Sequence, residues 1–343
     1  MEPDFSLIKA LPKTDLHIHL DGSLRVSTLI DLARRQKVDL PSFSPETLAP
    51  IVMSGKNCRN LGEYLRGFDI TLSVMQEPEA LRRIAFELAE DAAEENVWYM
   101  EVRYSPILHL QKGLALETIV DAVLEGLREA EQKYPIRTGV IICGMRNIHP
   151  DKSLQLAELA IKYKNRGVVA FDLAGQEENN PAKHHKEAFY QIRNNNINTT
   201  IHAGEAYGPE SIHQAIHYCG ANRIGHGTRL REDEDLKNYV NDHRIPLEVC
   251  LLSNVQTGAA ASLDTHPARE YLREGIRITL NTDNRLISDT TMSNEIYLAM
   301  KQLDFNMADI IKILTNGFKS VFLPYKERAA LLKKATAALE KFA

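Results

Sequence analysis

Short runs of apolar and β-branched residues recur along the chain, and stretches in which apolar residues recur at helical spacing separate most of them. The runs predict eight strands: Asp15–His19, Val97–Tyr104, Arg137–Cys143, Val168–Leu173, Asn198–His202, Arg223–His226, Pro246–Leu251 and Ile276–Thr282. The stretches between them predict helices such as Glu79–Glu94, Leu116–Lys133, Ser153–Lys164 and Pro209–Tyr218. Strands that alternate with helices pair in parallel. Eight such units predict an α/β protein with one closed (β/α)8 TIM barrel rather than an open sheet.

The interval between the first and second predicted strands is too long for a single crossover helix. It follows the carboxyl end of the first strand, which faces the active site in barrel enzymes. Its apolar residues at helical spacing are Leu61, Tyr64, Leu65 and Phe68. From spacing alone, this helical insertion, at approximately residues 40–78, either closes over a pocket or packs on the barrel wall. The tail, Ala308–Phe342, predicts extra helices at the C-terminus.

A chain of 343 residues, 44% hydrophobic and 25% charged, can bury a large core. The length would permit two domains, but a barrel with insertions also reaches it, and we expect one domain over residues 1–343. The net charge of -5 includes no basic stripe, so we do not expect nucleic acid as a partner. The sequence does not indicate an oligomeric state.

The four cysteines form no C-x-x-C pair, which is typical of a protein from a reducing compartment. The N-terminal residues lack the basic and then apolar run of an export signal, and no apolar run is long enough to span a membrane. We therefore expect a cytoplasmic protein that does not associate with membranes.

Two histidines at the end of the first predicted strand are candidate metal ligands. His17 and His19 are two residues apart, so their side chains point to the same face of the strand, which in a barrel is the interior. Neutral imidazoles bind zinc well. Taken alone, the pair is equally consistent with two core histidines that have hydrogen-bond partners.

Other predicted strands end in residues of the same chemical kind. The fifth ends in His202 and is followed by Glu205, the sixth ends in His226, and the eighth is followed by Asp283 and Asn284. Barrel enzymes take their catalytic groups from the ends of several strands, which meet at one rim. Chance alone would rarely place such residues at several strand ends, so their recurrence favours a functional site.

Three histidines and one carboxylate could meet near the barrel axis: His17, His19, His202 and Asp283. This set suits one Zn²⁺ ion per chain, with a water molecule completing a five-coordinate shell. Zinc lowers the pKa of such a water, which becomes a nucleophile near neutral pH. We expect no second metal, because the fourth strand ends in Asp172–Gly175 without a lysine that could be modified into a bridging ligand.

Two further residues could carry acid–base chemistry. Glu205 lies near the expected metal, and burial in an apolar pocket would raise its pKa and make it a general acid. The alternative for Glu205 is a first-turn glutamate that is favoured by the helix dipole. His226 could donate a hydrogen bond to the attacking hydroxide and stabilise charge. Its alternative is a structural histidine.

The motifs at these strand ends resemble those of the adenosine deaminase family. The matching segments are TDLHIHLDGS (14–23), EVRYSP (101–106), DLAGQE (172–177), HAGE (202–205), GPES (208–211), RIGHG (223–227), LLSN (251–254) and LNTD (280–283). They follow the family's order, and together they are specific, although no single one is. The resemblance implies a barrel, one zinc ion, and hydrolysis of adenosine or 2′-deoxyadenosine to the 6-oxo nucleoside and ammonia, a reaction of purine salvage.

The resemblance also implies residue roles. The zinc ligands would be His17, His19, His202 and Asp283. Glu205 would donate a proton to purine N1, His226 would steer the hydroxide at C6, and Asp283 would also take the proton of the water. Substrate contacts would come from His19, from Asp21 to the ribose 5′-hydroxyl, and from the backbone N–H of Gly175 to N3. The helix bearing Leu61, Tyr64, Leu65 and Phe68 would cover the ribose side, which favours a lid.

Three positions refine the substrate. Asn284 stands where many relatives carry a second Asp, and its amide could donate to N7 without a pKa shift. Gln176 stands where many relatives carry Asp, with no clear consequence. A charged Asp21 would repel a 5′-phosphate, so AMP is expected to be a poor substrate. Adenine deaminases tend to carry Glu at the position of Asp21, so Asp favours a nucleoside.

Two alternatives remain open. One is a deaminase of adenine or another aminopurine on the same scaffold, against which Asp21 is the only evidence. The other is a purine-binding protein without activity, which the presence of every expected ligand and of Glu205 disfavours. Two smaller expectations concern structure: Arg103, a charge on a barrel strand, should anchor a buried network, and His184 and His185 should be solvated in a polar loop.

Overall fold

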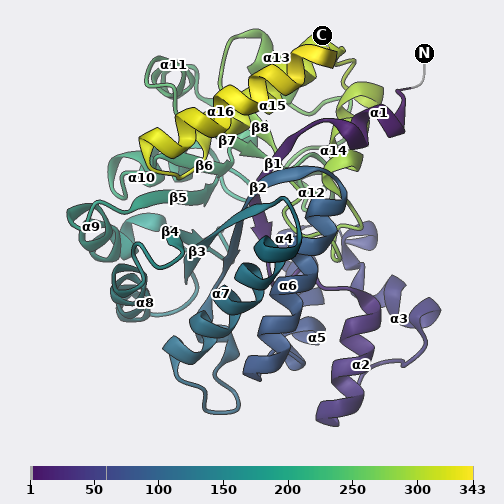
Figure 1. Cartoon of the computed structure of the whole chain (residues 1–343). Helices are drawn as coiled ribbons and strands as arrows, with labels where there is room; N and C mark the ends of the chain where they lie inside the picture. Colours follow the sequence, from purple (N-terminus) through teal and green to yellow (C-terminus); the bar gives the residue numbers. More distant parts are fainter. Residues whose placement is uncertain (1–2, 59, 343) are drawn as a thin grey trace.

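Eight parallel strands form the centre of the computed structural model, which describes residues 3–58 and 60–342 (Figure 1). The strands are β1 Lys13–His19, β2 Val97–Tyr104, β3 Arg137–Met145, β4 Val168–Ala174, β5 Asn198–Ala203, β6 Arg223–His226, β7 Leu247–Val249 and β8 Ile278–Leu280. Each strand pairs with the next in sequence order, and a parallel bridge between Ile18 and Asp283 joins the first strand to the end of the last. The predicted (β/α)8 TIM barrel is confirmed.

The last two strands are shorter than predicted, because side chains replace strand pairing beside them. After β8, the Asn281 amide donates to the Val249 carbonyl and accepts from the Leu16 N–H. The Asp15 carboxylate accepts from the backbone and hydroxyl of Thr282. Polar side chains therefore close the barrel where regular pairing ends.

Helices surround the barrel, with additional helices after β1 and at the C-terminus, as predicted. The α-helices are α1 Phe5–Ala10, α2 Val26–Gln36, α3 Pro45–Val52, α4 Leu61–Leu65, α5 Gly67–Ser73, α6 Pro78–Glu94, α7 Leu116–Lys133, α8 Pro150–Lys162, α9 Lys186–Asn194, α10 Pro209–His217, α11 Glu234–Asp242, α12 Leu251–Gln256, α13 Ala268–Arg273, α14 Met292–Gln302, α15 Met307–Ser320 and α16 Tyr325–Leu339. The short 3₁₀ turns are η1 Ser54–Asn57, η2 Pro106–His109, η3 Ala182–His185, η4 Thr228–Glu232 and η5 Glu340–Phe342. In the described residues, no helix is long and apolar enough to cross a lipid bilayer.

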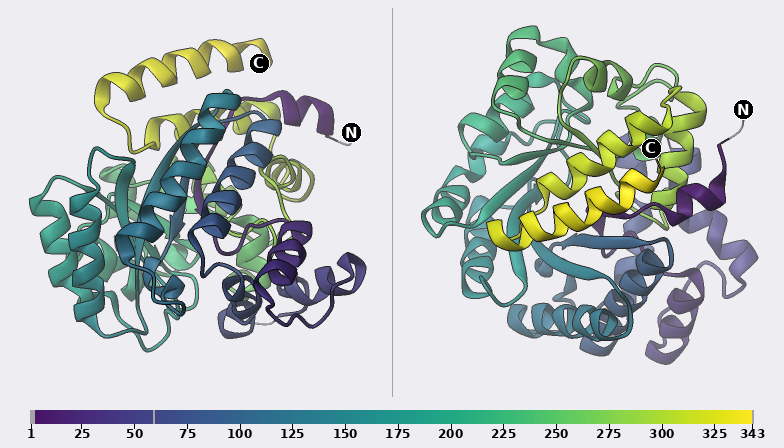
Figure 2. Two further views of the ribbon diagram at one scale, coloured as in Figure 1. Left: turned by 60° about the horizontal axis from the view of Figure 1, so that its bottom comes forward. Right: turned by 45° about the horizontal axis from the view of Figure 1, so that its top comes forward.

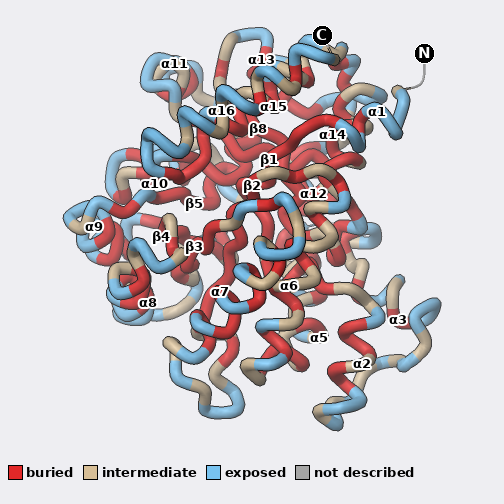
Figure 3. Tube along the Cα trace, in the orientation of Figure 1, coloured by how far each residue is buried: buried red, intermediate tan, exposed pale blue. Residues whose placement is uncertain are grey.

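The strands are buried almost throughout, because side chains fill the barrel on one face and helices cover the other (Figure 3). At the amino ends of the strands, the segment between α15 and α16 packs inward. Val321 and Leu323 contact Leu16 and Tyr99, and Phe322 contacts Ile141 and Ala170. Helices α15 and α16 lie across this end (Figure 2). The opposite end, where the strands terminate, is left for a site.

The insertion after β1 contains α2, α3, η1, α4 and α5 before the crossover helix α6. The single helix predicted from the spacing of apolar residues is divided into α4 and α5, with Arg66 between them. Leu61 and Tyr64 are buried, whereas Leu65 and Phe68 are partly buried. The insertion therefore packs tightly at its first turn and exposes more of the next.

Candidate metal centre and substrate pocket

Backbone pairing at the junction of the first and last strands places Asp283 beside the two histidines of β1. The Asp283 N–H donates to the His17 carbonyl at 2.8 Å, and the His19 N–H donates to the Asp283 carbonyl at 2.7 Å. Asp283 adopts the left-handed conformation, with φ +59°. Few non-glycine residues do so, and such conformations gather at functional sites.

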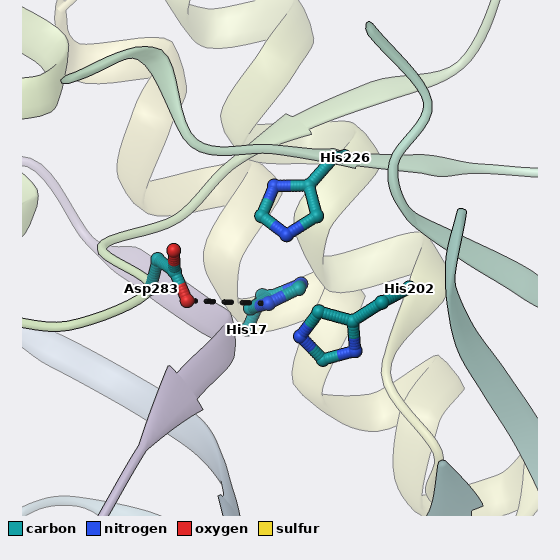
Figure 4. A group of neighbouring side chains, drawn as sticks. All are labelled: His17, His202, His226 and Asp283. Atoms are coloured by element: carbon teal, nitrogen blue, oxygen red, sulfur yellow. Dashed lines mark ion pairs between the residues drawn. The ribbon is translucent and has the colours of Figure 1, made fainter. Parts of the chain in front are cut away.

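A buried cluster of His17, His202, His226 and Asp283 forms at the carboxyl ends of the strands (Figure 4). One potential ligand atom from each lies within 4.8 Å of every other. His19 joins them, because its Nε2 lies 3.0 Å from His202 Nε2 and 3.5 Å from Asp283 Oδ1. The structure thus brings the four predicted ligands together, and adds His226 at similar distance. Imidazole nitrogens and a carboxylate are donors that suit zinc.

Two buried carboxylates orient the histidines of this cluster. His17 Nδ1 lies 2.9 Å from Glu248 Oε2, and His202 Nδ1 lies 2.9 Å from Asp172 Oδ2. A carboxylate accepts, so each Nδ1 donates and each Nε2 presents a lone pair to the cluster. His17 Nε2 is buried without a hydrogen-bond partner. A buried acceptor without a donor, supported by a carboxylate behind the ring, fits a metal ligand.

Arg103 holds both of these carboxylates from the middle of the barrel. Its guanidinium donates to Asp172 at 3.1 Å and to Glu248 at 2.8 Å, and all three side chains are buried. It also donates to the Leu16 carbonyl. The prediction that Arg103 anchors a buried network is confirmed, and the network ends on two candidate ligands.

The electrostatics of the cluster favour a cation. Burial lowers the pKa of His19, His202 and His226, so these imidazoles are neutral at pH 7. Burial and Arg103 act to lower the pKa of His17, but the nearby carboxylates of Asp283, 3.5 Å from its Nε2, and of Glu248, 2.9 Å from its Nδ1, outweigh them and raise it. Burial would raise the pKa of Asp283, but His17 outweighs it and keeps the carboxylate ionised. Charges that favour a proton on His17 also favour a metal ion.

Glu205 faces the same cluster from the loop after β5. One of its carboxyl oxygens lies 3.6 Å from His226 Nε2, and its side chain is buried. Burial, followed by the charges of Asp283 and Glu177, raises the pKa of Glu205 well above its usual range. The raised pKa favours the protonated form of Glu205, which is the form that a general acid needs.

Glu177 fixes the loop that carries Glu205. Its buried carboxylate accepts from four successive backbone N–H groups, those of residues 204–207, at 2.6–3.0 Å. Gly204 begins this loop with φ +73°, and a Cβ there would meet Ile212 at 2.5 Å, so glycine is required. Successive amides that converge on an anion form a nest. The loop is thereby held by one side chain.

A cavity of about 340 Å³ adjoins the cluster, within the size range of small-molecule sites. The predicted substrate residues in its wall are His19, Asp21, Leu65, Phe68 and Gly175. Leu61 and Tyr64 are buried outside that wall; the Tyr64 hydroxyl instead lies 2.7 Å from Ser288 Oγ and 2.9 Å from Asn284 Nδ2. A larger hollow, of about 640 Å³, lies between α1, α2 and the start of α14, and none of the candidate ligands lines it.

Two predicted substrate contacts need refinement. The Asn284 amide nitrogen, predicted as a donor to N7, already has Tyr64 as a partner, and Asn284 Oδ1 is buried without one. Burial raises the pKa of Asp21 to about 7. The repulsion that Asp21 would exert on a phosphate is therefore only partial near neutral pH.

Several residues of the site were absent from the sequence-based set. Asp172, Glu177 and Asn254 lie inside the matching motifs, which give their positions in the chain but not their roles. Glu248 gives the same signal as Arg103, a charge within a predicted strand. His266, which contacts Asn254, gave no signal. The prediction that His185 is solvated is wrong: it is buried and pairs with Ser153 Oγ at 2.8 Å, because the η3 turn folds it inward.

Comparisons with known proteins agree with this geometry. Residues 12–338 match the family described as adenosine deaminase. The chain is 43% identical to the adenosine deaminase of Mycobacterium avium (strain 104), over 95% of this chain and 94% of the relative. It is 42% identical to a probable adenosine deaminase of Dictyostelium discoideum, over 94% of this chain but only 42% of that protein. The solved adenine deaminase of Arthrobacter aurescens superposes with a TM-score of 0.90 at 25% identity, covering 96% of this chain and 99% of that one.

Proposed function

The chain belongs to the adenosine deaminase family, and from that premise we propose that it hydrolyses adenosine and 2′-deoxyadenosine to inosine and 2′-deoxyinosine, with release of ammonia. The observation that carries this proposal is the buried cluster of imidazoles and Asp283 beside the buried carboxyl of Glu205, at the edge of a cavity. A nucleophile and a proton donor would then meet on one purine ring.

We propose that one zinc ion per chain is held by His17, His19, His202 and Asp283. The orphaned Nε2 of His17 and the carboxylates behind the rings support this assignment. When bound, zinc supplies the Lewis acidity that makes water a nucleophile at neutral pH.

The side chains then divide the proton transfers. Asp283, ionised, accepts a proton from the attacking water. Glu205, protonated, donates to purine N1 as the oxygen adds at C6, which prevents negative charge from building up on the ring. His226 donates a hydrogen bond to the incoming oxygen. The amino group takes the proton held by Asp283, the C6–N bond breaks and ammonia leaves. The C6 hydroxyl loses its proton as the 6-oxo group forms, which restores the proton of Glu205, so that the sum is adenosine plus water to inosine plus ammonia.

The cavity residues orient the nucleoside. The Gly175 N–H donates to N3, and Asn284 donates to N7 with the amide hydrogen that Tyr64 does not take. Asp21 and His19 lie toward the ribose. The insertion with Leu61, Tyr64, Leu65 and Phe68 acts as a lid on the ribose side, within one catalytic domain formed by the whole chain. We further propose a cytoplasmic enzyme of purine salvage; the four unpaired cysteines support a reducing compartment.

A second candidate is adenine deamination, which the likeness to the Arthrobacter enzyme favours. Asp21 argues against it, because a buried carboxyl in the cavity wall needs a polar partner such as a sugar hydroxyl. The test is an ultraviolet assay of adenosine, 2′-deoxyadenosine, adenine and AMP in parallel, with metal analysis. We expect adenosine to be turned over best. Faster turnover of adenine would overturn the substrate assignment, and no turnover of either would overturn the function.

A further inference from the structure

His226 has a protein partner on the side that faces away from the cluster. Its Nδ1 lies 3.0 Å from the amide nitrogen of Asn254, in α12. The amide oxygen of Asn254 lies 3.2 Å from Nε2 of His266. The other nitrogen of His266, Nδ1, lies 3.1 Å from the backbone nitrogen of Ala268. All these groups are buried, and they form one continuous chain of hydrogen bonds.

The donor and acceptor of every hydrogen bond in this chain follow from the backbone N–H of Ala268 at its far end. A backbone N–H can only donate, so Ala268 makes His266 Nδ1 an acceptor. A neutral imidazole with an accepting Nδ1 carries its proton on Nε2, so His266 donates to the Asn254 oxygen. The opposite end of that amide, its NH₂ group, then faces His226 and donates to His226 Nδ1. His226 must therefore carry its proton on Nε2.

The reverse orientation is excluded by the same backbone group. If the Asn254 oxygen faced His226, its NH₂ group would face His266 Nε2, which would have to accept. The proton of His266 would then lie on Nδ1 and point at the N–H of Ala268. Two donors would oppose each other in a buried position, and each would lose a hydrogen bond that nothing in the protein replaces.

We propose that Ala268, His266 and Asn254 lock His226 in the Nε2–H tautomer, so that His226 donates a hydrogen bond inside the site and does not ligate the metal. Asn254 and His266 are positioning residues, since they act through His226. His226 Nε2 lies close enough to His17 and Asp283 to be a ligand, but a protonated nitrogen has no lone pair to offer. The part of the proposal that concerns catalysis rests on the proposed function; the tautomer does not.

The surroundings support a fixed ring. Burial, followed by Arg231, lowers the pKa of His266 to about 3, so this imidazole is neutral near pH 7. His226 itself lies in the left-handed region, with φ +63°, directly before Gly227 at φ +67°. The backbone therefore fixes where the ring sits, and the amide of Asn254 fixes which nitrogen carries hydrogen.

The direct test is nuclear magnetic resonance of the whole protein labelled with ¹⁵N in its histidines, with and without zinc. Long-range correlations between ring protons and nitrogens identify the protonated nitrogen of each imidazole. The signals of His226 are assigned from their absence in His226→Asn. We expect hydrogen on Nε2 of both His226 and His266. Hydrogen on Nδ1 of His226 would overturn the proposal, and this spectrum requires no variant of Asn254.

Two substitutions of Asn254 test the catalytic consequence. In Asn254→Asp the carboxylate can only accept, so it draws the proton of His226 to Nδ1; kcat should fall about 10³-fold or more, as a wrong tautomer costs about 10⁴-fold in serine proteases. In Asn254→Ala either tautomer is allowed, and the loss should be about tenfold. A role in packing predicts the opposite order, because Asp keeps the volume and Ala does not. Asn254→Ala as the slower enzyme would therefore contradict the proposal.

Asn241→Asp makes the same substitution at a half-buried position on α11, a helix that carries none of the cluster residues. It is the matched control and should retain wild-type kcat. Zinc content separates loss of the tautomer from loss of the metal and should stay at one ion per chain in each variant. The two hypotheses fail in different ways. Absence of adenosine turnover in the wild type would refute the proposed function, whereas the spectrum alone decides the tautomer.

Discussion

The two ends of the barrel both bury charged and polar side chains, but they differ in whether the polar atoms have hydrogen-bond partners. Toward the amino ends of the strands, Arg223 donates to Glu101, to Glu248 at 2.5 Å, and to the Ser320 carbonyl at 2.7 Å. Each nitrogen of its guanidinium has a partner. Toward the carboxyl ends, His17 Nε2, Asp21 Oδ1 and Asn284 Oδ1 are buried without one.

The difference separates structural charge from functional charge. A buried network whose members are all paired stabilises one arrangement and has nothing left to offer a ligand. Unpaired buried atoms cost stability, so several of them gathered around the cluster and its cavity mark a place where a ligand could pair with them. Glu248 connects the two ends, since one of its oxygens bonds to Arg223 and the other to His17 and Arg103. The structural end therefore holds the functional end in place.

The largest expected effect is at the acid of the functional end. Glu205→Gln keeps the shape of the side chain but cannot deliver a proton to N1, so we expect kcat to fall about 10⁴-fold. Zinc content should remain at the wild-type level, because Glu205 is not among the proposed ligands. Steady-state kinetics with metal analysis measure both. Wild-type turnover would remove Glu205 from the mechanism.

Two arginine variants test the comparison itself. Arg103→Met and Arg223→Met each remove a positive charge that buried carboxylates share, and each should lower the free energy of unfolding by about 3–5 kcal/mol. Only Arg103→Met should also weaken zinc binding, by about 10–100-fold, because Arg103 holds both carboxylates behind the ligands. Urea unfolding and zinc titration of the folded protein measure the two effects. Equal zinc affinity in the two variants would show that the two ends of the barrel do not have separate structural and functional roles.

The stability of the protein should depend on pH through His109, a buried histidine outside the cluster. Burial lowers the pKa of His109 to about 4, and its Nδ1 donates to the Met75 carbonyl at 2.9 Å. Between pH 6.5 and 4 the unfolded chain binds this proton and the native protein does not, so stability falls as the pH falls, by about 3 kcal/mol at most. His109→Asn keeps a donor and removes the titration. Urea unfolding from pH 7 to pH 4 should give a shallower decline in the variant; parallel curves would refute the linkage.

Glu177 should affect turnover through position alone. Glu177→Gln replaces one accepting oxygen with a donor that opposes the backbone N–H groups of residues 204–207, so the loop shifts and takes Glu205 with it. We expect kcat to fall about 10²-fold, since a displacement of about 1 Å has such effects. Its exposed neighbour provides the control, and Glu178→Gln should retain full activity. Unchanged kcat in the Glu177 variant would show that the nest does not position the acid.

The smallest effect is expected at the lid. Phe68→Ala removes apolar surface from the cavity wall without touching the cluster, so KM for adenosine should rise about tenfold with kcat nearly unchanged. Phe43, an exposed aromatic before α3, offers the control Phe43→Ala. A fall in kcat at constant KM would place Phe68 in the chemistry and not in the lid.

Alternating strand and helix patterns predicted the barrel because most strands are short runs rich in apolar and β-branched residues. The ends of β7 and β8 were overextended, since Asn281 and Asp15 bond the backbone with side chains and leave no periodic signal. The insertion showed helical spacing, but the break at Arg66 depends on packing that spacing does not report.

The candidate ligands were predictable because strand ends in a barrel converge, so the positions of His17, His202 and Asp283 in the chain imply their proximity. The residues that hold these ligands from behind were harder to predict from the sequence. Glu177 meets residues 204–207 through backbone groups, which carry no side-chain signature. His266 lies in a loop whose course the periodicity does not determine, so its contact with Asn254 required the structure.

The central claim, that the unpaired atoms at the carboxyl end of the barrel hold one zinc ion that turnover requires, is tested by titrating metal-free protein with zinc while following adenosine conversion. We predict negligible activity without metal and a linear rise that stops at one zinc ion per chain. Full turnover of the metal-free protein, or a plateau at two ions, would contradict it.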